Sequence, residues 1–329
     1  MVGSNKFSFV SGDYVNNVIF KDFTVDATSM ASNVGGKALF MRYIEDAVFE
    51  NLKLVNTQMT ALGIDFLNRV KILNCNVIGA GRGRFSALVS TGVGCSGIGI
   101  GMGWASHKEN FVISNCICDG CYNNGIFVED QGRFASGGAV MTDGSGQVIA
   151  NNICRNGKNC GISVWGGKKV SIVGNVCYNN GSSSTGYQGG GFQIGYYGED
   201  VTIVGNQSIE NYYGFKIADL SKPTSKVLFT SNEVRNSTVA GIYIATSGRA
   251  NYLILKSNFL LNNPTGVQIT GNSTGLVIQG NNEMASNAVS FNIAGTQTNA
   301  VIKDNTYLSN PNVTATFDGN TTFVEQFNE

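Results

Sequence analysis

A five-residue pattern of hydrophobic and polar positions recurs along most of the chain. Each copy reads Gly, apolar, any residue, apolar, any residue. The copies begin at Gly63, Gly97, Gly125, Gly161, Gly191, Gly214, Gly241 and Gly266, with a weaker copy at Ser290–Ile293. Alternating apolar residues are typical of a β-strand with one buried face, and such a strand needs neighbouring copies to complete a core. We expect the copies to stack into buried columns such as Ile98, Ile126, Ile162, Phe192, Phe215 and Ile242.

A second apolar segment precedes most copies, as in Val170–Ile172 and Leu253–Leu255, so each coil has at least two strands. An asparagine recurs just after this segment, at Asn76, Asn152, Asn175, Asn206, Asn232, Asn258, Asn281 and Asn305. An inward Asn at a tight corner tolerates left-handed backbone angles and passes amide hydrogen bonds from coil to coil. The patterns together predict an all-β, single-stranded, right-handed parallel β-helix of about 10–12 coils.

The repeats also set the expected domain boundaries. We expect one β-helix domain over residues 15–310, a lead-in or cap remnant over 1–14, and a C-terminal cap or tail over 311–329. The first ten residues lack the basic start and apolar middle of a signal peptide. An uncapped end would expose the core, so we expect either a short cap in residues 1–14 or upstream sequence that has been removed.

Composition and charge narrow the function classes. Charged residues make up only 13% of the chain, with 43 Gly and 3 Pro, which disfavours a disordered tail or a helical bundle. Lys plus Arg and Asp plus Glu number 22 each, so no global field would attract nucleic acid or an anionic membrane. No apolar run reaches the length of a membrane span.

The eight cysteines follow the register of the coils. Cys118, Cys154 and Cys177 each lie two residues after the Asn position, and Cys116 replaces Asn in its own coil. We interpret them as stacked, buried, reduced thiols that behave as small hydrophobic residues. A metal or redox role for Cys118 and Cys121 is disfavoured because no second paired motif accompanies them.

Uneven coil lengths predict where a site lies. The steps between repeats are longer before Gly191 than after it, and insertions in a solenoid form loops on its faces, so we expect the site between residues 60 and 200. A groove along a rod suits an extended sugar chain, with aromatic rings stacking on sugars and charged groups binding hydroxyls or uronates. The candidate substrate-binding residues are Arg82, Arg84, Trp104, His107, Arg133, Asp143, Trp165, Tyr196 and Tyr197.

One local feature predicts catalytic residues. Every outward position from Gly97 to Gly103 is glycine, so the surface there is a floor without side chains. Asp65 precedes this floor by one coil and Glu129 follows it by one coil, which separates their backbones by about 10 Å. Inverting glycosidases hold two carboxyl groups about 6.5–9.5 Å apart, one as general acid and one as general base. We therefore predict Asp65 and Glu129 as such a pair, with Asp130 as a substitute.

The repeats over residues 14–310 resemble the pectate-lyase-like superfamily of right-handed β-helix proteins, which includes polysaccharide lyases, glycosidases, alginate epimerases and phage tailspikes. The segments Ser96–Gly101 and Asn123–Glu129 look like the β-helix part of phage tail proteins. That resemblance implies a polysaccharide-degrading spike that binds a bacterial surface glycan, typically as a homotrimer. It also implies action on the virion or outside the cell, after synthesis without a signal peptide.

Two alternatives stay open. A uronan lyase or C5-epimerase would use a base and cations, for which the candidates are Arg82, Arg84, Arg133, Lys168 and Lys169. Calcium is an expected cofactor only for a lyase, and the other functions considered need none. Leu62–Asn68 resembles the epimerase signature Tyr-Gly-Phe-Asp-Pro-His-Glu at its Gly and Asp positions only. Leu67 and Asn68 replace its His and Glu, which removes two proton-transfer groups. The second alternative is a non-catalytic module that binds a glycan or serves as a structural tail or surface fibre.

Overall fold

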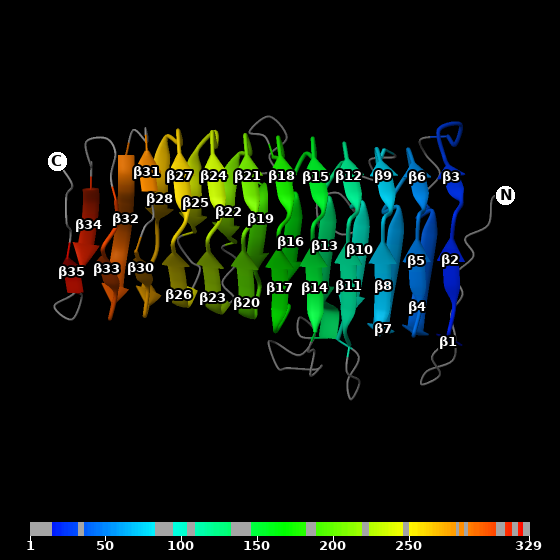
Figure 1. The fold of residues 1–329 in the computed structure, drawn as a ribbon, viewed down its shortest axis with the longest axis horizontal. Helices are drawn as coiled ribbons and strands as arrows, with labels where there is room; N and C mark the ends of the chain where they lie inside the picture. Colours follow the sequence, from blue (N-terminus) through cyan, green and yellow to red (C-terminus); the bar gives the residue numbers. More distant parts are fainter. Residues whose placement is uncertain are drawn as a thin grey trace.

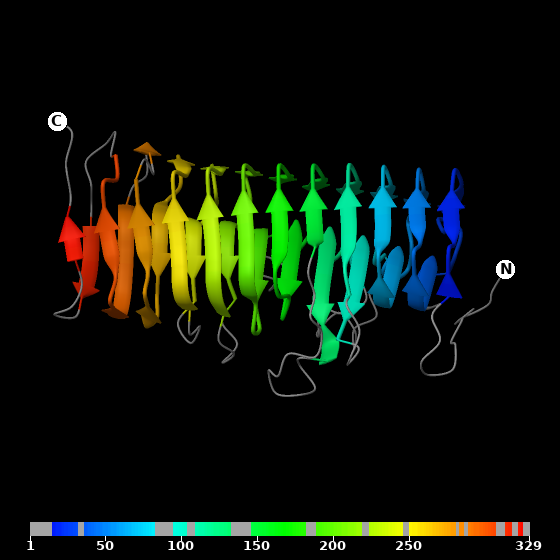
Figure 2. The same ribbon diagram turned by 60° about the horizontal axis from the view of Figure 1, so that its bottom comes forward.

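The computed structural model describes the chain in twelve segments. They are residues 15–31, 36–82, 95–103, 109–132, 146–181, 189–218, 224–245, 250–280, 283–285, 289–306, 313–317 and 322–324. Within these residues the chain winds into a rod whose strands stack along the long axis, with the first described strand, Val15–Asn16, at one end and the last, Thr322–Val324, at the other (Figures 1 and 2).

The strands form three faces, and the strand pairings are parallel. Face 1 contains β1 (Val15–Asn16), β4 (Leu39–Glu45), β7 (Leu62–Asn68), β10 (Ile98–Met102), β13 (Ile126–Asp130), β16 (Ile162–Trp165), β19 (Gly190–Gly195), β22 (Tyr213–Ile217), β25 (Ala240–Ile244), β28 (Thr265–Ile269), β32 (Val289–Thr298) and β34 (Val313–Phe317). Face 2 contains β2 (Ile19–Lys21), β5 (Val48–Glu50), β8 (Val70–Leu73), β11 (Phe111–Ser114), β14 (Gln147–Ala150), β17 (Val170–Val173), β20 (Glu199–Val204), β23 (Thr224–Thr230), β26 (Ala250–Lys256), β29 (Ser273–Thr274), β30 (Val277–Gln279), β33 (Val301–Lys303) and β35 (Thr322–Val324).

Face 3 is a separate 10-stranded sheet. It contains β3 (Thr24–Asp26), β6 (Lys53–Val55), β9 (Asn76–Ile78), β12 (Ile117–Asp119), β15 (Ile153–Arg155), β18 (Val176–Tyr178), β21 (Gln207–Ile209), β24 (Glu233–Arg235), β27 (Phe259–Leu261) and β31 (Glu283–Ala285). Each complete coil therefore contributes three strands, one more than the two that the sequence pattern revealed. The predicted all-β parallel β-helix is confirmed.

The hydrophobic core fills the inside of the rod, and the predicted column runs through it. Successive members pair across neighbouring face-1 strands, and all are at most 1% exposed: Ile98, Ile126, Ile162, Phe192, Phe215 and Ile242. Stacking identical or similar side chains at every coil removes them from water without any need for a second layer of structure.

A buried asparagine ladder supports the corner between faces 2 and 3. The side-chain oxygen of Asn206 accepts hydrogen bonds from the backbone N and Nδ2 of Asn175, at 2.8 and 2.9 Å, and Asn206 in turn donates to Asn232. The same bonds join Asn152 to Asn175 and Asn232 to Asn258. These bonds satisfy buried backbone groups that no strand partner reaches.

Two details of the predicted ladder were wrong, and one lies outside the described residues. Asn76 is on β9 and pairs with Ile117, while the buried Cys75 takes the ladder position. The left-handed angle belongs to the residue before the ladder position, as at Asn151 with φ 57°. That residue makes the turn, which leaves the ladder asparagine free to point inward. Asn281 is not among the described residues.

The cysteines occupy the interior, as expected. Cys118, Cys154 and Cys177 pair in register on face 3, and all eight cysteines are buried and free of disulfides. Burial raises the pKa of the Cys160 thiol to about 11. These thiols therefore act as core side chains.

Candidate functional site

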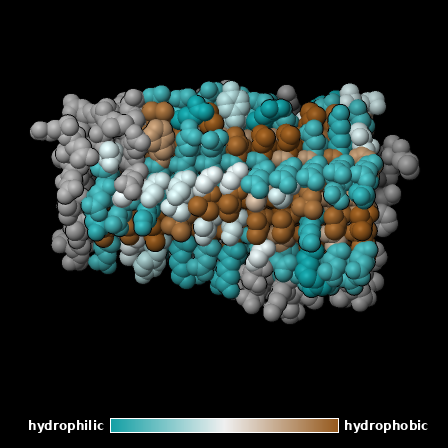
Figure 3. All heavy atoms as spheres, viewed as in Figure 1, coloured by the Kyte–Doolittle hydropathy of each residue, from teal (hydrophilic) through white to brown (hydrophobic). Residues whose placement is uncertain are grey.

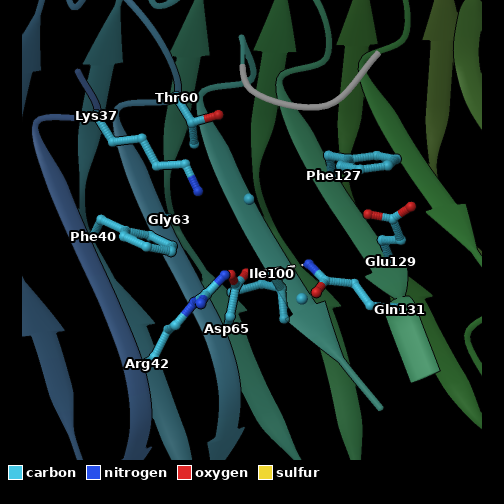
Figure 4. A pocket seen from close by; sticks show the side chains of 12 residues that line it. Lys37, Phe40, Arg42, Thr60, Gly63, Asp65, Ile100, Phe127, Glu129 and Gln131 are labelled. Atoms are coloured by element: carbon cyan, nitrogen blue, oxygen red, sulfur yellow. Dashed lines mark hydrogen bonds and ion pairs between the residues drawn. The ribbon is translucent and has the colours of Figure 1, made fainter. Parts of the chain in front are cut away.

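An open cavity of about 190 Å³ lies on face 1, over β4, β7, β10 and β13. Charged, polar, aromatic and apolar residues line it, together with three glycines: Lys37, Phe40, Arg42, Thr60, Gly63, Asp65, Gly99, Ile100, Gly101, Phe127, Glu129 and Gln131. Asp65 and Glu129 thus share one cavity, with their side chains on opposite sides of β10 (Figure 4).

Strand register places the two acids in one outward row. Asp65 pairs directly with Gly101, and Gly101 pairs directly with Glu129. The acids are therefore two strand spacings apart, about 9.6 Å at the backbone. The same row continues from Arg42, which pairs with Asp65, to Trp165, which pairs with Glu129.

This register differs from the alignment of the repeats by two residues in one coil. Aligning Gly63 with Gly97 would set Asp65 opposite Gly99, but Gly63 pairs with Gly99 and Leu62 with Ile98. The copy of the repeat in this coil therefore begins at Ala61, not at Gly63. A shift of two residues keeps the same side chains inward, so the apolar pattern alone does not distinguish the two registers.

Asp65 is almost buried and is held from two sides. Its carboxylate accepts a hydrogen bond from Arg42 Nε at Oδ2, at 3.3 Å, and one from Gln131 Nε2 at Oδ1, at 3.4 Å. The Asp65 side chain is 9% exposed and that of Arg42 is 44% exposed. Arg42 supplies a counter-charge, and the two bonds fix the direction of the carboxylate.

Glu129 has a different environment. Burial raises the pKa of its carboxyl group to about 7, and repulsion from Asp65 and Asp130 adds to this effect. Its row neighbours are the bare Gly101 on one side and Trp165 on the other. A carboxyl group with a pKa near neutrality carries its proton in a substantial fraction of molecules at physiological pH, as a general acid requires.

The absence of a side chain at position 101 is necessary for this geometry. A Cβ there would collide with Asp65 Oδ1 and Gln131 Nε2. Gly99 also lines the cavity, so two of the four predicted floor glycines lie there. Gly97 and Gly103 do not. A Cβ at Gly97 would meet the core sulfurs of Cys118 and Cys121, so the prediction that Gly97 faces outward was wrong, and Gly103 lies against Gly132.

Aromatic side chains border the Glu129 end of the cavity. Phe127 meets Trp165 edge to face, with ring centroids 5.0 Å apart, and Trp165 packs against Tyr196 at 4.2 Å. Tyr196 and its neighbour Tyr197 are half-buried and have positive φ angles of 51° and 71°. Two predicted binding residues, Trp165 and Tyr196, thus gather next to the predicted acid.

Other predicted residues lie elsewhere. Asp130 is 2% exposed, pairs with the buried Met102 and does not line the cavity. Arg82 donates to the backbone oxygens of Thr28 and Met30, away from the cavity. Nζ of the lyase candidate Lys168 lies 3.8 Å from Oε2 of Glu199. Neither Lys168 nor Lys169 lines the cavity. Five predicted residues lie outside the described residues: Arg84, Trp104, His107, Arg133 and Asp143.

The sequence reasoning missed the basic end of the cavity. Lys37 Nζ lies 3.7 Å from the centroid of the Phe40 ring, and the Arg42 guanidinium lies 5.3 Å from it. These residues precede the expected site range of 60–200. Their coil lacks the leading glycine of the repeat, although the alternation of Leu39 and Met41 signals its strand.

No group of three or more His, Cys, Asp or Glu residues that could hold a metal ion occurs among the described residues. Within the same residues, no helix is long and apolar enough to cross a membrane.

Comparisons with known proteins agree with this architecture. Residues 133–259 match the family described as "Right handed beta helix region". The chain is thus a right-handed parallel β-helix. None of the curated proteins matches its sequence significantly.

Solved structures with low sequence identity share the fold, and three of them illustrate it. PfbA, a surface adhesin of Streptococcus pneumoniae, aligns with a TM-score of 0.58 and 13% identity over 83% of this chain and 69% of its own. The Dettilon tailspike protein aligns at 0.54 and 12%, over 93% of this chain and 59% of the tailspike. Pectate lyase Pel9A aligns at 0.51 and 12%, over 94% and 79%. These identities establish a shared fold and leave the activity to be argued from the site.

Proposed function

We propose that this chain degrades a polysaccharide by hydrolysis, with Glu129 as general acid and Asp65 as general base. The observation that carries the proposal is the row Asp65, Gly101, Glu129 in an open cavity, with the pKa of Glu129 raised to about 7. Two carboxyl groups in unlike environments are what acid and base roles require.

The proposed reaction is a single displacement. Glu129 donates its proton to the glycosidic oxygen as the bond to the anomeric carbon breaks. Asp65 accepts a proton from a water molecule whose oxygen attacks the same carbon from the opposite side, so the new hemiacetal has inverted configuration. The two acids are about 9.6 Å apart at the backbone, and their side chains would need to hold the carboxyl groups about 6.5–9.5 Å apart to leave room for that water, as in inverting enzymes.

Individual neighbours support these roles. Arg42 and Gln131 hold both oxygens of Asp65, and its Oδ1 lies over Gly101, the residue between the two acids in the row. Trp165 and Phe127 offer ring faces and edges beside Glu129, and aromatic rings are suitable surfaces for sugars.

The activity is tested by incubating the protein with bacterial surface polysaccharides and measuring new reducing ends. Hydrolysis requires reducing ends without the ultraviolet absorbance of an unsaturated product.

The second candidate is a glycan-binding or structural module without catalysis. The similarity to PfbA favours it, because that protein is described as a surface adhesin. Retained binding to a glycan that Asp65→Asn, Glu129→Gln and the parent protein all leave intact would support this candidate. A lyase would instead produce the ultraviolet absorbance.

The fold shared with a tailspike also supports a proposal about location and assembly. We propose that the chain acts outside the cell, on a virion or at a bacterial surface, and assembles as a homotrimer. An outward column on face 2 supports self-association, because only one of its eleven residues is charged. It consists of Ile19, Val48, Lys71, Val112, Val148, Ser171, Thr202, Leu228, Ile254, Val277 and Val301.

This column appears as a hydrophobic band along the rod (Figure 3). Eleven coils at about 4.8 Å give a band about 50 Å long. One outward column covers about 7 Å along each strand, so the band offers about 350 Å² per copy, and an interface of the standard size of roughly 800 Å² per partner would include the flanking columns as well.

A further inference from the structure

We propose that the sugar unit bound on the Asp65 side of the cavity is acidic, and that Lys37 and Arg42 bind its carboxylate. The inference deepens the proposed function and rests on it, because it places this unit relative to the two proposed catalytic acids. It names the substrate as a polysaccharide with a carboxylated sugar next to the cleaved bond.

The two cations lie together at one end of the cavity (Figure 4). The stem of Lys37 covers Gly63, since a Cβ at position 63 would lie 2.9 Å from Lys37 Cδ and 3.2 Å from Nζ. Its Nζ lies 3.7 Å from the centroid of the Phe40 ring. The Arg42 guanidinium, which contacts Asp65, lies on the same side of Asp65 as Lys37. The missing side chain at Gly63 thus lets Lys37 reach over the strand that carries Asp65.

Arg42 retains binding capacity beyond its contact with Asp65. Its Nε donates to Asp65, and no hydrogen bond joins either Nη group to another described residue. A guanidinium has five N–H donors in a flat fork that matches the two oxygens of a carboxylate. A sugar carboxylate in front of Arg42 and Lys37 would therefore meet both a directional donor and a point charge.

The charges that line the cavity also favour an anion. Four of the lining residues are ionisable: Lys37, Arg42, Asp65 and Glu129. When Glu129 carries the proton that catalysis requires, the two lining cations face the carboxylate of Asp65, and Asp130 adds a second negative charge that acts on Glu129. A substrate carboxylate placed at Lys37 and Arg42 would be attracted by both cations.

The opposite end of the cavity has different chemistry. The row beyond Glu129 continues with Trp165 and Gly195, and the adjacent row beyond Phe127 continues with Ser163 and Gln193. None of these four residues is charged, and the next residue of the Phe127 row, Lys216, lies three strands from Phe127. The two ends of the cavity therefore differ in charge along the rod. We expect an acidic sugar unit on the Asp65 side and a neutral unit on the Trp165 side.

The test separates binding from cleavage. Glu129→Gln protein is titrated by calorimetry with polygalacturonate, alginate and hyaluronan, and with the same polymers after reduction of their carboxyl groups to alcohols. We expect binding of at least one acidic polymer to weaken about tenfold on carboxyl reduction and to weaken in high salt. Adding Lys37→Met should weaken it about five- to tenfold, whereas the control Lys256→Met, on β26 of face 2, should not change it.

Each outcome decides between the two claims. Equal binding of an acidic polymer and its reduced form, or full binding by the Lys37→Met variant, would overturn the acidic unit. Charge-dependent binding without cleavage by the parent protein would keep the acidic unit and contradict hydrolysis. Cleavage of a reduced polymer as fast as its acidic form would keep hydrolysis and contradict the acidic unit. Failure to bind any polymer, acidic or neutral, would count against both.

Discussion

The raised pKa of Glu129 predicts a measurable cost to the stability of the folded protein. Its pKa rises from 4.5 to about 7, mainly because burial disfavours the charged carboxylate. Each pKa unit corresponds to about 1.4 kcal/mol, so ionising Glu129 in the folded protein costs about 3 kcal/mol relative to ionising it in the unfolded chain. Glu129→Gln removes this cost because the amide has a similar shape and no charge.

The sign of the pH dependence follows from the direction of the shift. Between pH 4.5 and about 7 the folded protein holds the Glu129 proton while the unfolded chain releases it. The stability that the folded protein gains from a protonated Glu129 is therefore fully present below pH 4.5, and it is lost as the pH rises through about 7. The variant and the parent should have similar stability in acid, and the variant should be more stable in mild alkali.

The assay is thermal and urea unfolding of both proteins across this pH range, with Glu50→Gln on face 2 as the control for loss of one acidic side chain. For a chain of 329 residues, about 3 kcal/mol corresponds to a melting-temperature difference of about 4 °C. A difference between Glu129→Gln and the parent that stays constant with pH would refute the assignment of a buried, protonated Glu129.

Four further substitutions test separate parts of the account. Gly101→Ala should lower turnover at least tenfold with little change in stability, because the new methyl group displaces the carboxylate of Asp65, as kinetics and melting curves would show. Trp165→Ala should raise KM by about five- to tenfold and leave kcat within about twofold, and an unchanged KM would exclude stacking on the substrate. Asn206→Ala should lower the unfolding free energy by about 3 kcal/mol, since it breaks several buried hydrogen bonds, and a loss under about 1 kcal/mol in urea titrations would contradict the ladder's role. Val148→Lys should shift the mass measured by light scattering from trimer to monomer, and a parent protein that is already monomeric would contradict the assembly proposal.

The fold was predictable because its signal repeats. The column from Ile98 to Ile242 recurs with the same apolar alternation in every coil, and each copy reinforces the same conclusion. The third strand of each coil escaped notice because it is only three residues long in most coils, as in Ile117–Asp119 and Ile153–Arg155. Three residues are too few to establish an alternation.

The candidate site was predictable only in part. Asp65 and Glu129 were identified because a glycine-rich strand separates them in the sequence, and the structure brings them into one cavity. Lys37 and Arg42 were missed because their positions depend on the register of β4 against β7, which a period-two pattern does not fix. Gln131 follows β13 and reaches back over β10, a contact between coils that no local pattern encodes.

The most direct test of the central claim is a reducing-end assay on bacterial surface polysaccharides, with ultraviolet absorbance recorded in parallel, for the parent, Asp65→Asn and Glu129→Gln proteins. The account predicts new reducing ends without absorbance for the parent and a loss of at least about a hundredfold in kcat for each variant. It predicts in addition that the alkaline limb of the parent's pH profile falls near pH 7, where Glu129 loses its proton. Absorbance from an unsaturated product, or full activity in Glu129→Gln, would contradict it.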